Sequence, residues 1–463
     1  MVNRREFLTA ASLGPFVLRA KTSQMNLLFL CSDQHQREDS GCYGSSEVET
    51  PHIDEIAKAA VRFDRVYCQA PVCVPSRGSI VTSLYPHTHG AKILDDPLPA
   101  SVRTIAHYFR ERGYLTGAIG KMHFVDETQR HGFDYRLYLD DFLATLTKEE
   151  REMVKRDQGG AEGVGGRPSK LGARFFQDNW YAEKTVEFLH QNRNRPFCLW
   201  SSYLKPHTPL VPMKQYFDRY ADKPLSLPKR SSHELEDGFP GNLIRAKERG
   251  WYTQTDDQLR RSLAGYYGNI TQMDACVGRV YDTLRELGLD RNTVVVYTSD
   301  HGEMAGAHRM WTKHNMYEQS VAVPLLVSVP DRALSRTARH ELIEQVDLFP
   351  TLAELCGQAA PKEVVGRSFA PLMRNERYTP REFAYSEYYF CRKVFTRDDR
   401  YVGKPPILMV RTNEWKLNYL SWSRCELYDV RKDPGEFQNR IDDSGCSGVA
   451  KELTGIAERM FHV

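Results

Sequence analysis

The stretch Asn26-Leu27-Leu28-Phe29-Leu30-Cys31-Ser32 is a continuous apolar run that ends in a polar residue, and it decides the fold. A strand that is apolar on both sides is typical of a parallel sheet covered by helices on both faces. Asp33 and Gln34 follow it directly. Open parallel sheets bind their ligands beyond the carboxyl ends of the strands. The run therefore predicts a buried central strand and the edge at which a functional site lies.

Similar runs recur along the chain, with amphipathic helical segments between them. This alternation predicts an α/β fold with one large, mostly parallel sheet flanked by helices on both faces. The strand-like runs are 116–119, 197–203, 293–299 and 325–329, and the clearest helical segments are 102–112 and 259–287.

After about residue 375 the pattern changes to short extended segments, followed by a helical segment at 449–461. This change predicts a smaller C-terminal antiparallel sheet with a helix. We therefore divide the chain into a main domain at 25–375 and a C-terminal subdomain at 376–463. Two stretches, 161–170 and 224–251, lack clear periodicity, and we expect them to be surface loops that shape a substrate pocket.

Composition excludes several classes of protein. The chain has 463 residues, of which 41% are hydrophobic and 27% charged, and its net charge is only +3. Such a weak charge argues against nucleic acid as a partner. No apolar run reaches the roughly 18 to 20 residues that span a bilayer, so stable membrane insertion is not expected. Ten scattered cysteines form no CxxC pair, which favours mostly free, buried thiols over a zinc site and leaves isolated disulfides open.

The N-terminus carries Arg4-Arg5-Glu6-Phe7-Leu8 before a modestly apolar stretch. A twin arginine in this setting predicts a twin-arginine export signal over residues 1–24, and with it a periplasmic or secreted protein. One alternative is a disordered basic terminus. Another is a true start at Met25, which would make the protein cytoplasmic.

Two acidic residues follow two of the predicted strands directly. Asp33 and Gln34 follow the first, and Asp300 and His301 follow the strand at 293–299. Their side chains could converge on one divalent cation, because the carboxyl ends of parallel strands meet at one edge of a sheet. Oxygen ligands favour Ca²⁺ or Mg²⁺, while an imidazole admits Mn²⁺. The competing interpretation is that each aspartate only caps a following helix.

A third motif reads Cys73-Val74-Pro75-Ser76-Arg77-Gly78-Ser79. Pro75 and Ser76 are good residues to start a helix, so a helix is predicted over 76–84. Cys73 would then lie at the positive end of that helix, where anions bind. Arg77, in the first turn, could brace a charged group there. Alternatively, Cys73 is a buried structural cysteine.

The pattern Cys-x-Pro-Ser-Arg resembles the maturation sequence of type I sulfatases, within the alkaline phosphatase superfamily. The stretch 113–123, which ends in Gly120-Lys121-Met122-His123, is similar to the second sulfatase signature. Further matches appear in the order of the family, and together they cover about residues 26 to 440. They are found at 50–54, 205–209, 313–318, 323–325 and 426–434.

The resemblance implies an alkaline-phosphatase-like fold, a catalytic sulfatase domain at 25–375 and a sulfuric ester hydrolase. In this family a separate maturation enzyme oxidises the cysteine, here Cys73, to formylglycine, whose hydrate is the nucleophile. A divalent metal, Ca²⁺ in our assignment with Mg²⁺ or Mn²⁺ as alternatives, activates it. The implied metal ligands are Asp33, Gln34, Cys73, Asp300 and His301.

The resemblance also implies catalytic roles. Arg77 and Lys121 would stabilise the ionised diol, and Lys121 and Lys313 would neutralise the sulfate oxygens. His207, together with Lys313, would protonate the leaving oxygen. His123 would deprotonate the remaining hydroxyl so that free sulfate leaves.

Many family members carry Asp-Asp and Asp-Asn where this chain has Asp33-Gln34 and Asp300-His301. A similar variation occurs in the choline-sulfatase and phosphonate-monoesterase branches. Three hypotheses follow: a sulfatase for a carbohydrate or small organic sulfate ester, a formylglycine-dependent phosphodiesterase or phosphonate monoester hydrolase, and a non-catalytic binding protein with unmodified Cys73. The complete set of lysines and histidines opposes the third. Candidate substrate contacts in the insertions and nearby are Arg167, Trp180, Arg245 and Trp251.

Overall fold

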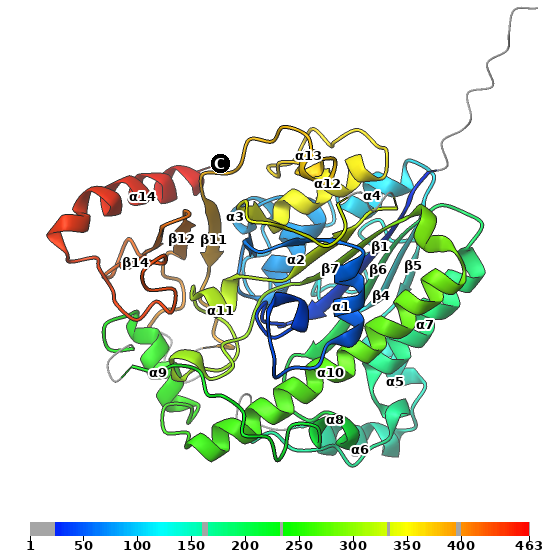
Figure 1. Cartoon of the computed structure of the whole chain (residues 1–463), viewed down its shortest axis with the longest axis horizontal. Coiled ribbons are helices and arrows are strands. Elements are labelled where there is room, and N and C mark those ends of the chain that lie inside the picture. The colour runs from blue at the N-terminus through cyan, green and yellow to red at the C-terminus, as the bar shows by residue number, and fades with distance from the viewer. Residues whose placement is uncertain (1–23, 160–164, 232–234, 331–333, 395–399, 463) are drawn as a thin grey trace, which may run out of the picture.

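The computed structural model describes residues 24–159, 165–231, 235–330, 334–394 and 400–462 (Figure 1). Within these residues, no helix is both long enough and apolar enough to cross a membrane. The export signal expected at 1–24 falls outside the described residues except for its last position, and it stays a prediction.

A large mixed sheet forms the centre of the protein. In the described part of the chain it has eight strands in the order β5-β4-β6-β1-β7-β8-β2-β9. Strand β1 pairs in parallel with β6 on one side and with β7 on the other. All strands run in one direction except β8, which is antiparallel to both of its neighbours. The strands are β1 (Asn26–Asp33), β2 (Val61–Phe63), β4 (Leu115–Gly120), β5 (Tyr135–Leu137), β6 (Phe197–Pro206), β7 (Thr293–Ser299), β8 (Leu325–Ser328) and β9 (Thr337–Arg339).

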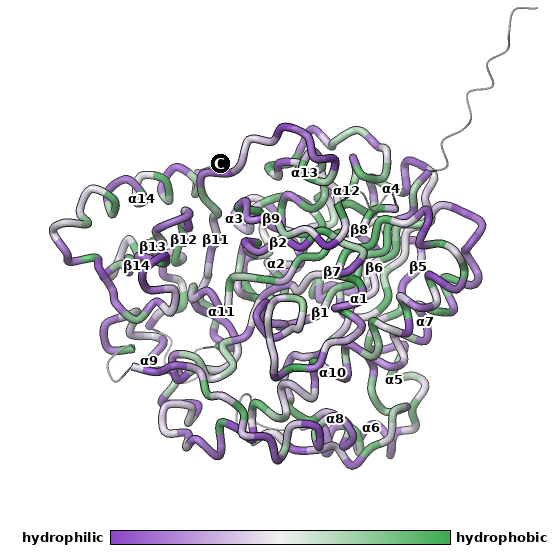
Figure 2. Tube along the Cα trace, in the orientation of Figure 1, coloured by the Kyte–Doolittle hydropathy of each residue, from purple (hydrophilic) through white to green (hydrophobic). Residues whose placement is uncertain are grey.

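Strand β1 is buried along its whole length because helices cover both faces of the sheet. Leu28 and Leu30 belong to the core on one face, and Leu27 and Phe29 to the core on the other. Fully burying one such side chain stabilises the fold by about 1.5–3 kcal/mol, so burial on both faces holds this strand in the interior. Figure 2 shows the hydrophobic residues gathered along the central strands and hydrophilic ones in the outer loops.

Different sets of helices cover the two faces. The face of Leu28 carries α1 (Pro51–Lys58), α7 (Gln177–Asn192) and α10 (Asp256–Glu286), and the face of Leu27 carries α2 (Cys73–Thr82), α4 (Ile105–Arg110) and α12 (Leu348–Leu355). The predicted α/β architecture is confirmed.

The direction of β8 differs from the expectation. The run at 325–329 was interpreted as one more parallel strand, and this was wrong, since β8 pairs with β7 in antiparallel register. A parallel neighbour needs a crossover that returns the chain to the opposite edge of the sheet. The α-helix that the structure describes between β7 and β8 is α11 (Glu318–Val321), which has only four residues. The chain therefore stays at the carboxyl edge of β7, and β8 starts from there.

A second, smaller sheet near the C-terminus is antiparallel, as predicted (Figure 1). Helix α14 (Ser447–Met460) packs Leu453 and Ala457 against one of its faces. The backbone N–H of Glu387 donates to the carbonyl of Gln69, which ties this sheet to the segment before Cys73. The strands are β11 (Ala384–Tyr388), β12 (Ile407–Arg411), β13 (Trp415–Tyr419) and β14 (Glu426–Asp429). The domain boundary at 375/376 stays a prediction.

The described part of the insertion at 224–251 is more regular than a surface loop. It contains the helix α9 (Pro240–Glu248), and Trp251 directly after it is only 1% exposed. The remaining described elements are β3 (Val66–Tyr67), β10 (Ile343–Glu344), α3 (Pro86–His89), α5 (Leu139–Ala144), α6 (Lys148–Gln158), α8 (Lys214–Phe217) and α13 (Ala370–Met373), with short 3₁₀ turns at Gly41–Tyr43, Ala173–Phe175, Leu289–Asn292, Ala307–Arg309, Gln345–Asp347 and Ser444–Cys446. All ten cysteines are free in this structure, whereas their spacing favoured mostly free thiols and left isolated disulfides open.

Candidate active site

Cys73 is the first residue of helix α2, and Val72 before it has extended backbone. The predicted helix start at Ser76 was wrong by three residues. Pro75 is tolerated inside the first turn because the N–H that it lacks has no helical partner there. Ser76 does not cap the helix, since its hydroxyl donates to the carbonyl of Asp300. Cys73 consequently lies at the positive end of the helix dipole.

Four of the predicted metal ligands come together. The ligand atoms of Asp33, Cys73, Asp300 and His301 all lie within 4.8 Å of one another, and all four residues are buried. The Nε2 atom of His301 is 3.1 Å from the Sγ atom of Cys73. Its Nδ1 atom donates to the carbonyl of Gly302 at 3.0 Å. In the neutral ring Nε2 therefore carries the lone pair, which faces the cluster.

Gln34, the fifth predicted ligand, lies against this cluster. Its backbone N–H donates to Oδ1 of Asp300 at 3.1 Å, and its side-chain oxygen accepts a hydrogen bond from Nζ of Lys313. The backbone of Gln34 is left-handed, with φ of 69°. Such a conformation costs a non-glycine residue free energy, and the hydrogen bond to Asp300 offsets part of that cost.

Arg77 and Lys121 balance the negative charge of the cluster. Arg77 is fully buried, and its Nε donates to Asp300 at 2.8 Å while its Nη2 lies 3.4 Å from Asp33. Nζ of Lys121 forms an ion pair with Asp33 and lies 3.7 Å from the sulfur of Cys73. Buried charges are tolerated only when they are paired in this way. Sequence reasoning missed Ser202, which accepts from Nη1 of Arg77 at 2.8 Å, because a serine inside a strand carries no distinctive pattern.

The charges around Cys73 change its acidity. Burial raises the pKa of its thiol, but Lys121, Lys313 and His301 together lower that pKa well below its usual value. Burial and Cys73 also raise the pKa of Asp33, yet Lys121 and the other cations lower it overall. The site therefore stabilises negative charge at residue 73 and on the carboxylate beside it.

The end of β4 places Lys121 beside residue 73. Gly120 has φ of 95°, and a Cβ atom there would lie 1.7 Å from the carbonyl oxygen of Ser202. Only glycine fits this approach of two strands. His123 follows two residues after Lys121, also left-handed with φ of 59°, and its side chain lies close enough to Cys73 to lower the pKa of that thiol.

His207, in the segment after β6, lies near Cys73 and Asp33, both of which raise the pKa of its ring. Its Nδ1 atom donates to the carbonyl of Thr208 at 2.7 Å. Burial and then Lys313 lower the pKa of His207, while Asp33 raises it. The structure thus brings all the predicted site residues into one cluster.

The backbone of Lys313 is held by a buried arginine, Arg245, which the sequence offered as a candidate substrate contact. Arg245 donates to the carbonyls of Lys313 and His314, the latter at 3.1 Å. Arg245 and Trp251 are buried, at 2% and 1% exposed, and their role as substrate contacts stays a prediction. The guanidinium is needed inside because the loop around Lys313 has carbonyl groups that no strand or helix pairs. Trp180 packs against Phe142, and its role stays a prediction, as does that of Arg167.

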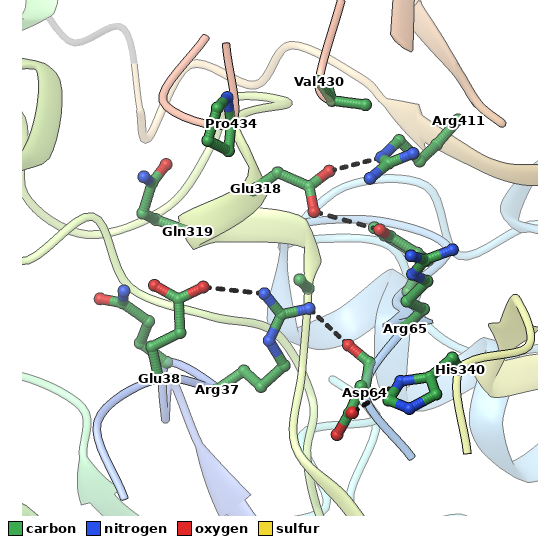
Figure 3. Close-up of a pocket in the computed structure, with 13 residues that line it drawn as sticks. Arg37, Glu38, Asp64, Arg65, Glu318, Gln319, His340, Arg411, Val430 and Pro434 are labelled. Atoms are coloured by element: carbon green, nitrogen blue, oxygen red, sulfur yellow. Dashed lines mark hydrogen bonds and ion pairs between the residues drawn. The ribbon is translucent and has the colours of Figure 1, made fainter. Parts of the chain in front are cut away.

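A separate charged cavity of about 330 Å³ lies between the loop after β1, helix α11 and the smaller sheet (Figure 3). It contains none of the predicted site residues. Arg37 contacts Glu38 at 2.8 Å, and Arg411 contacts Glu318 at 3.1 Å. Arg37 and Arg411 in this cavity are therefore each paired with a carboxylate.

Two family models match the chain. One described as Sulfatase covers residues 25–358. The other, described as N-sulphoglucosamine sulphohydrolase, C-terminal, covers residues 306–461. The solved structure of a phosphonate monoester hydrolase from Agrobacterium radiobacter has a similar fold, with a TM-score of 0.79 over 95% of each chain at 22% identity.

Curated relatives of this chain are also sulfatases by name. An arylsulfatase of Clostridium perfringens is 29% identical over 90% of this chain and 90% of its own. A choline-sulfatase of Rhizobium meliloti is 28% identical over 91% of this chain and 83% of its own. The family model spans most of the chain, including the whole cluster around Cys73. The chain therefore belongs to the sulfatase family and is a sulfuric ester hydrolase with an alkaline-phosphatase-like fold.

Proposed function

We propose that this protein hydrolyses a sulfate ester of a carbohydrate or small organic molecule, with formylglycine made from Cys73 as its nucleophile and a divalent cation beside it. One observation carries the proposal: the Cys73 sulfur is buried at a helix N-terminus with Lys121 and His301 within 3.7 Å and 3.1 Å of it. A structural cysteine needs no such surroundings, whereas a nucleophile that develops negative charge does.

The residues present fit a divalent cation. Asp33 and Asp300 supply carboxylate oxygens, Gln34 an amide oxygen and His301 an imidazole nitrogen. This donor set suits Ca²⁺, our assignment, and also Mg²⁺ or Mn²⁺. Arg77 would hold both carboxylates in place from behind, since its guanidinium touches both.

When bound, the cation and the hydrated aldehyde together supply an activated hydroxyl for attack on sulfur. The lysines of the site would then stabilise the negative charge. Lys121 and Lys313 would hold the negative oxygens of the sulfate, where charge must be stabilised in the transition state. Lys121 would in addition favour an ionised hydroxyl on residue 73, as its effect on the thiol already indicates.

Two histidines are placed to move protons. Because Nδ1 of His207 is occupied by the carbonyl of Thr208, its Nε2 atom would deliver a proton to the leaving oxygen. A bound sulfate ester adds negative charge beside this ring and favours its protonated form. His123, whose side chain lies near residue 73, would accept the proton whose removal lets sulfate leave.

A second candidate function is hydrolysis of a phosphodiester or phosphonate monoester by the same residues. The observation that favours it is the pair of uncommon ligands, Gln34 and His301. Gln34 makes the cluster less anionic than a third carboxylate would. The similar fold of a phosphonate monoester hydrolase supports the same alternative.

The proposal includes a maturation enzyme as the partner that oxidises Cys73. It also includes export through the twin arginine at Arg4 and Arg5, which would make the protein periplasmic or secreted. The choline-sulfatase among its relatives acts, by its name, on a small organic sulfate.

Mass spectrometry of the peptide that carries residue 73 tests the proposal directly, with protein co-expressed with a maturation enzyme. We expect formylglycine in active protein, and an unmodified thiol in fully active protein would overturn the mechanism. Parallel assays with an aryl sulfate, an aryl phosphodiester and an aryl phosphonate then test the substrate class. A clear preference for a phosphorus ester would favour the second candidate.

A further inference from the structure

Glu303 is a fully buried carboxylate that the proposed mechanism does not use. It lies in the loop that follows β7, three residues after Asp300 and two residues after His301. One of its oxygens accepts hydrogen bonds from the backbone N–H groups of Ala305, at 3.0 Å, and of Thr312. The other accepts from the side-chain nitrogen of Gln34. All three partners are donors, so both oxygens act as acceptors.

This arrangement decides which way the amide of Gln34 points. An amide has one oxygen and one nitrogen, and only the oxygen can bind a hard cation. Because the carboxylate of Glu303 accepts, it requires the nitrogen of Gln34 on its own side. The oxygen of Gln34 is thereby turned to the opposite side, where it accepts from Nζ of Lys313.

A carboxylate at position 34 would need no such partner, since both of its terminal atoms are oxygens. The amide needs one, because the reversed amide would present an N–H₂ group to the cation. We infer that Glu303 is a positioning residue, which orients the amide of Gln34 and so makes Gln34 a metal ligand. This inference rests on the divalent cation of the proposed function.

Glu303 also supports the loop that carries Lys313. Ala305 and Thr312, which donate to it, have left-handed backbone with φ of 46° and 66°. Non-glycine residues hold such conformations only when their surroundings stabilise them. One buried carboxylate therefore connects the neutral metal ligand with the loop of the sulfate-binding lysine.

The substitution Glu303→Gln tests the orientation of the Gln34 amide. It replaces an acceptor-only carboxylate by an amide of nearly the same shape. The N–H groups of Ala305 and Thr312 would fix the oxygen of the new amide on their side, so that its nitrogen faces Gln34. Gln34 would then face donors on both sides, the new amide nitrogen and Nζ of Lys313, so its own nitrogen would have no acceptor and its oxygen would no longer be held toward the cation. Removing a partner that orients a metal ligand typically weakens metal binding about 10- to 100-fold, and we expect a loss in this range.

The double substitution Gln34→Glu with Glu303→Gln is the matched control. It exchanges the amide and the carboxylate, keeps the total charge and again pairs an N–H₂ group with a carboxylate. The carboxylate at position 34 then has an oxygen for the cation. We expect this variant to bind metal at least about 10-fold more tightly than Glu303→Gln alone.

Metal affinity is measured by calorimetric titration of the full chain with Ca²⁺ and with Mn²⁺, and folding is checked by thermal unfolding in the presence of a chelator. Weak binding by Glu303→Gln together with recovery in the double variant supports the inference. Wild-type affinity in Glu303→Gln overturns it, as does a folded double variant without recovery. If Glu303→Gln does not fold, the metal affinity of the double variant decides. A recovered affinity supports the inference, and a lost affinity overturns it. A wild-type chain that binds neither ion would overturn the proposed cation, and this inference with it.

Discussion

The Nε2 atom of His301 lies 3.1 Å from the Sγ atom of Cys73, although 228 positions separate the two residues in the chain. His301 follows a strand at the centre of the sheet, and Cys73 begins a helix that covers one face. Their contact joins the proposed cation to the proposed nucleophile. Substitutions around this pair should therefore change activity, stability and proton transfer in distinguishable ways.

Cys73→Ala should lower kcat/KM for an aryl sulfate by at least about 1,000-fold, because no other group in the cluster can form the nucleophile. Cys276→Ala is the matched control, since Cys276 is a buried free cysteine in α10, and it should keep its activity. Initial rates on both variants decide the question. A retained rate in Cys73→Ala would place the nucleophile elsewhere.

Arg77→Met should destabilise the protein by about 3–5 kcal/mol in the presence of a chelator, because Asp33 and Asp300 lose their buried counter-charge. With saturating Ca²⁺ the loss should be smaller, since the cation then offsets the same carboxylates. Denaturant unfolding under both conditions measures the difference. The exposed Arg103, paired with Glu111, is the control, and Arg103→Met should cost less than about 1 kcal/mol in both. Equal losses for Arg77→Met in chelator and in Ca²⁺ would contradict the prediction.

His207→Ala should impair substrates according to their leaving groups. A nitrophenolate leaves without help, whereas an alkoxide or sugar oxygen needs a proton, so the loss of kcat should be about 100-fold or more for an alkyl sulfate and much smaller for nitrophenyl sulfate. His123→Ala is the comparison, because a residue that acts after the leaving group has departed should show no such dependence. Leaving-group dependence in His123→Ala with none in His207→Ala would reverse the two assignments.

Asp274 should make the fold less stable as pH rises from about 4 to 7. Burial raises the pKa of Asp274 to about 7, although its carboxyl accepts from the backbone N–H groups of His52 and Ile53 at 3.2 Å and 2.8 Å. The folded protein then binds a proton more tightly than the unfolded chain does. The stabilisation is complete below the unfolded pKa near 3.8 and is lost as pH approaches the folded pKa.

Asp274→Asn removes this ionisation, so its unfolding free energy should change less than that of wild type between pH 4 and pH 7. Denaturant unfolding across this range measures both slopes. The two proteins should differ by no more than about 4 kcal/mol over the range, since each tenfold change in proton affinity corresponds to about 1.36 kcal/mol. Parallel slopes for the two proteins would show that Asp274 is already ionised in the fold.

Much of the architecture could be predicted from local patterns. Strand β1 is apolar at most of its buried positions, so these residues alone indicated a strand covered on both faces. The start of α2 was misplaced because Ser76 is a common capping residue, and only its contact with Asp300 shows that its hydroxyl is used elsewhere. The contacts of Arg245 could not be predicted for a similar reason: nothing in a short stretch of sequence shows that a basic side chain will be buried against the carbonyls of a distant loop.

Short-range patterns in the chain were sufficient for the apolar strands, for the residue types that surround Cys73 and for the resemblance to sulfatases, because periodicity and short motifs are local properties. The reversed direction of β8, the burial of Arg77 between two carboxylates and the amide orientation of Gln34 came instead from tertiary contacts. Each of these depends on partners far away in the chain. Glu303 lies 269 positions from Gln34, and only folding brings its acceptor atoms to the nitrogen of that amide.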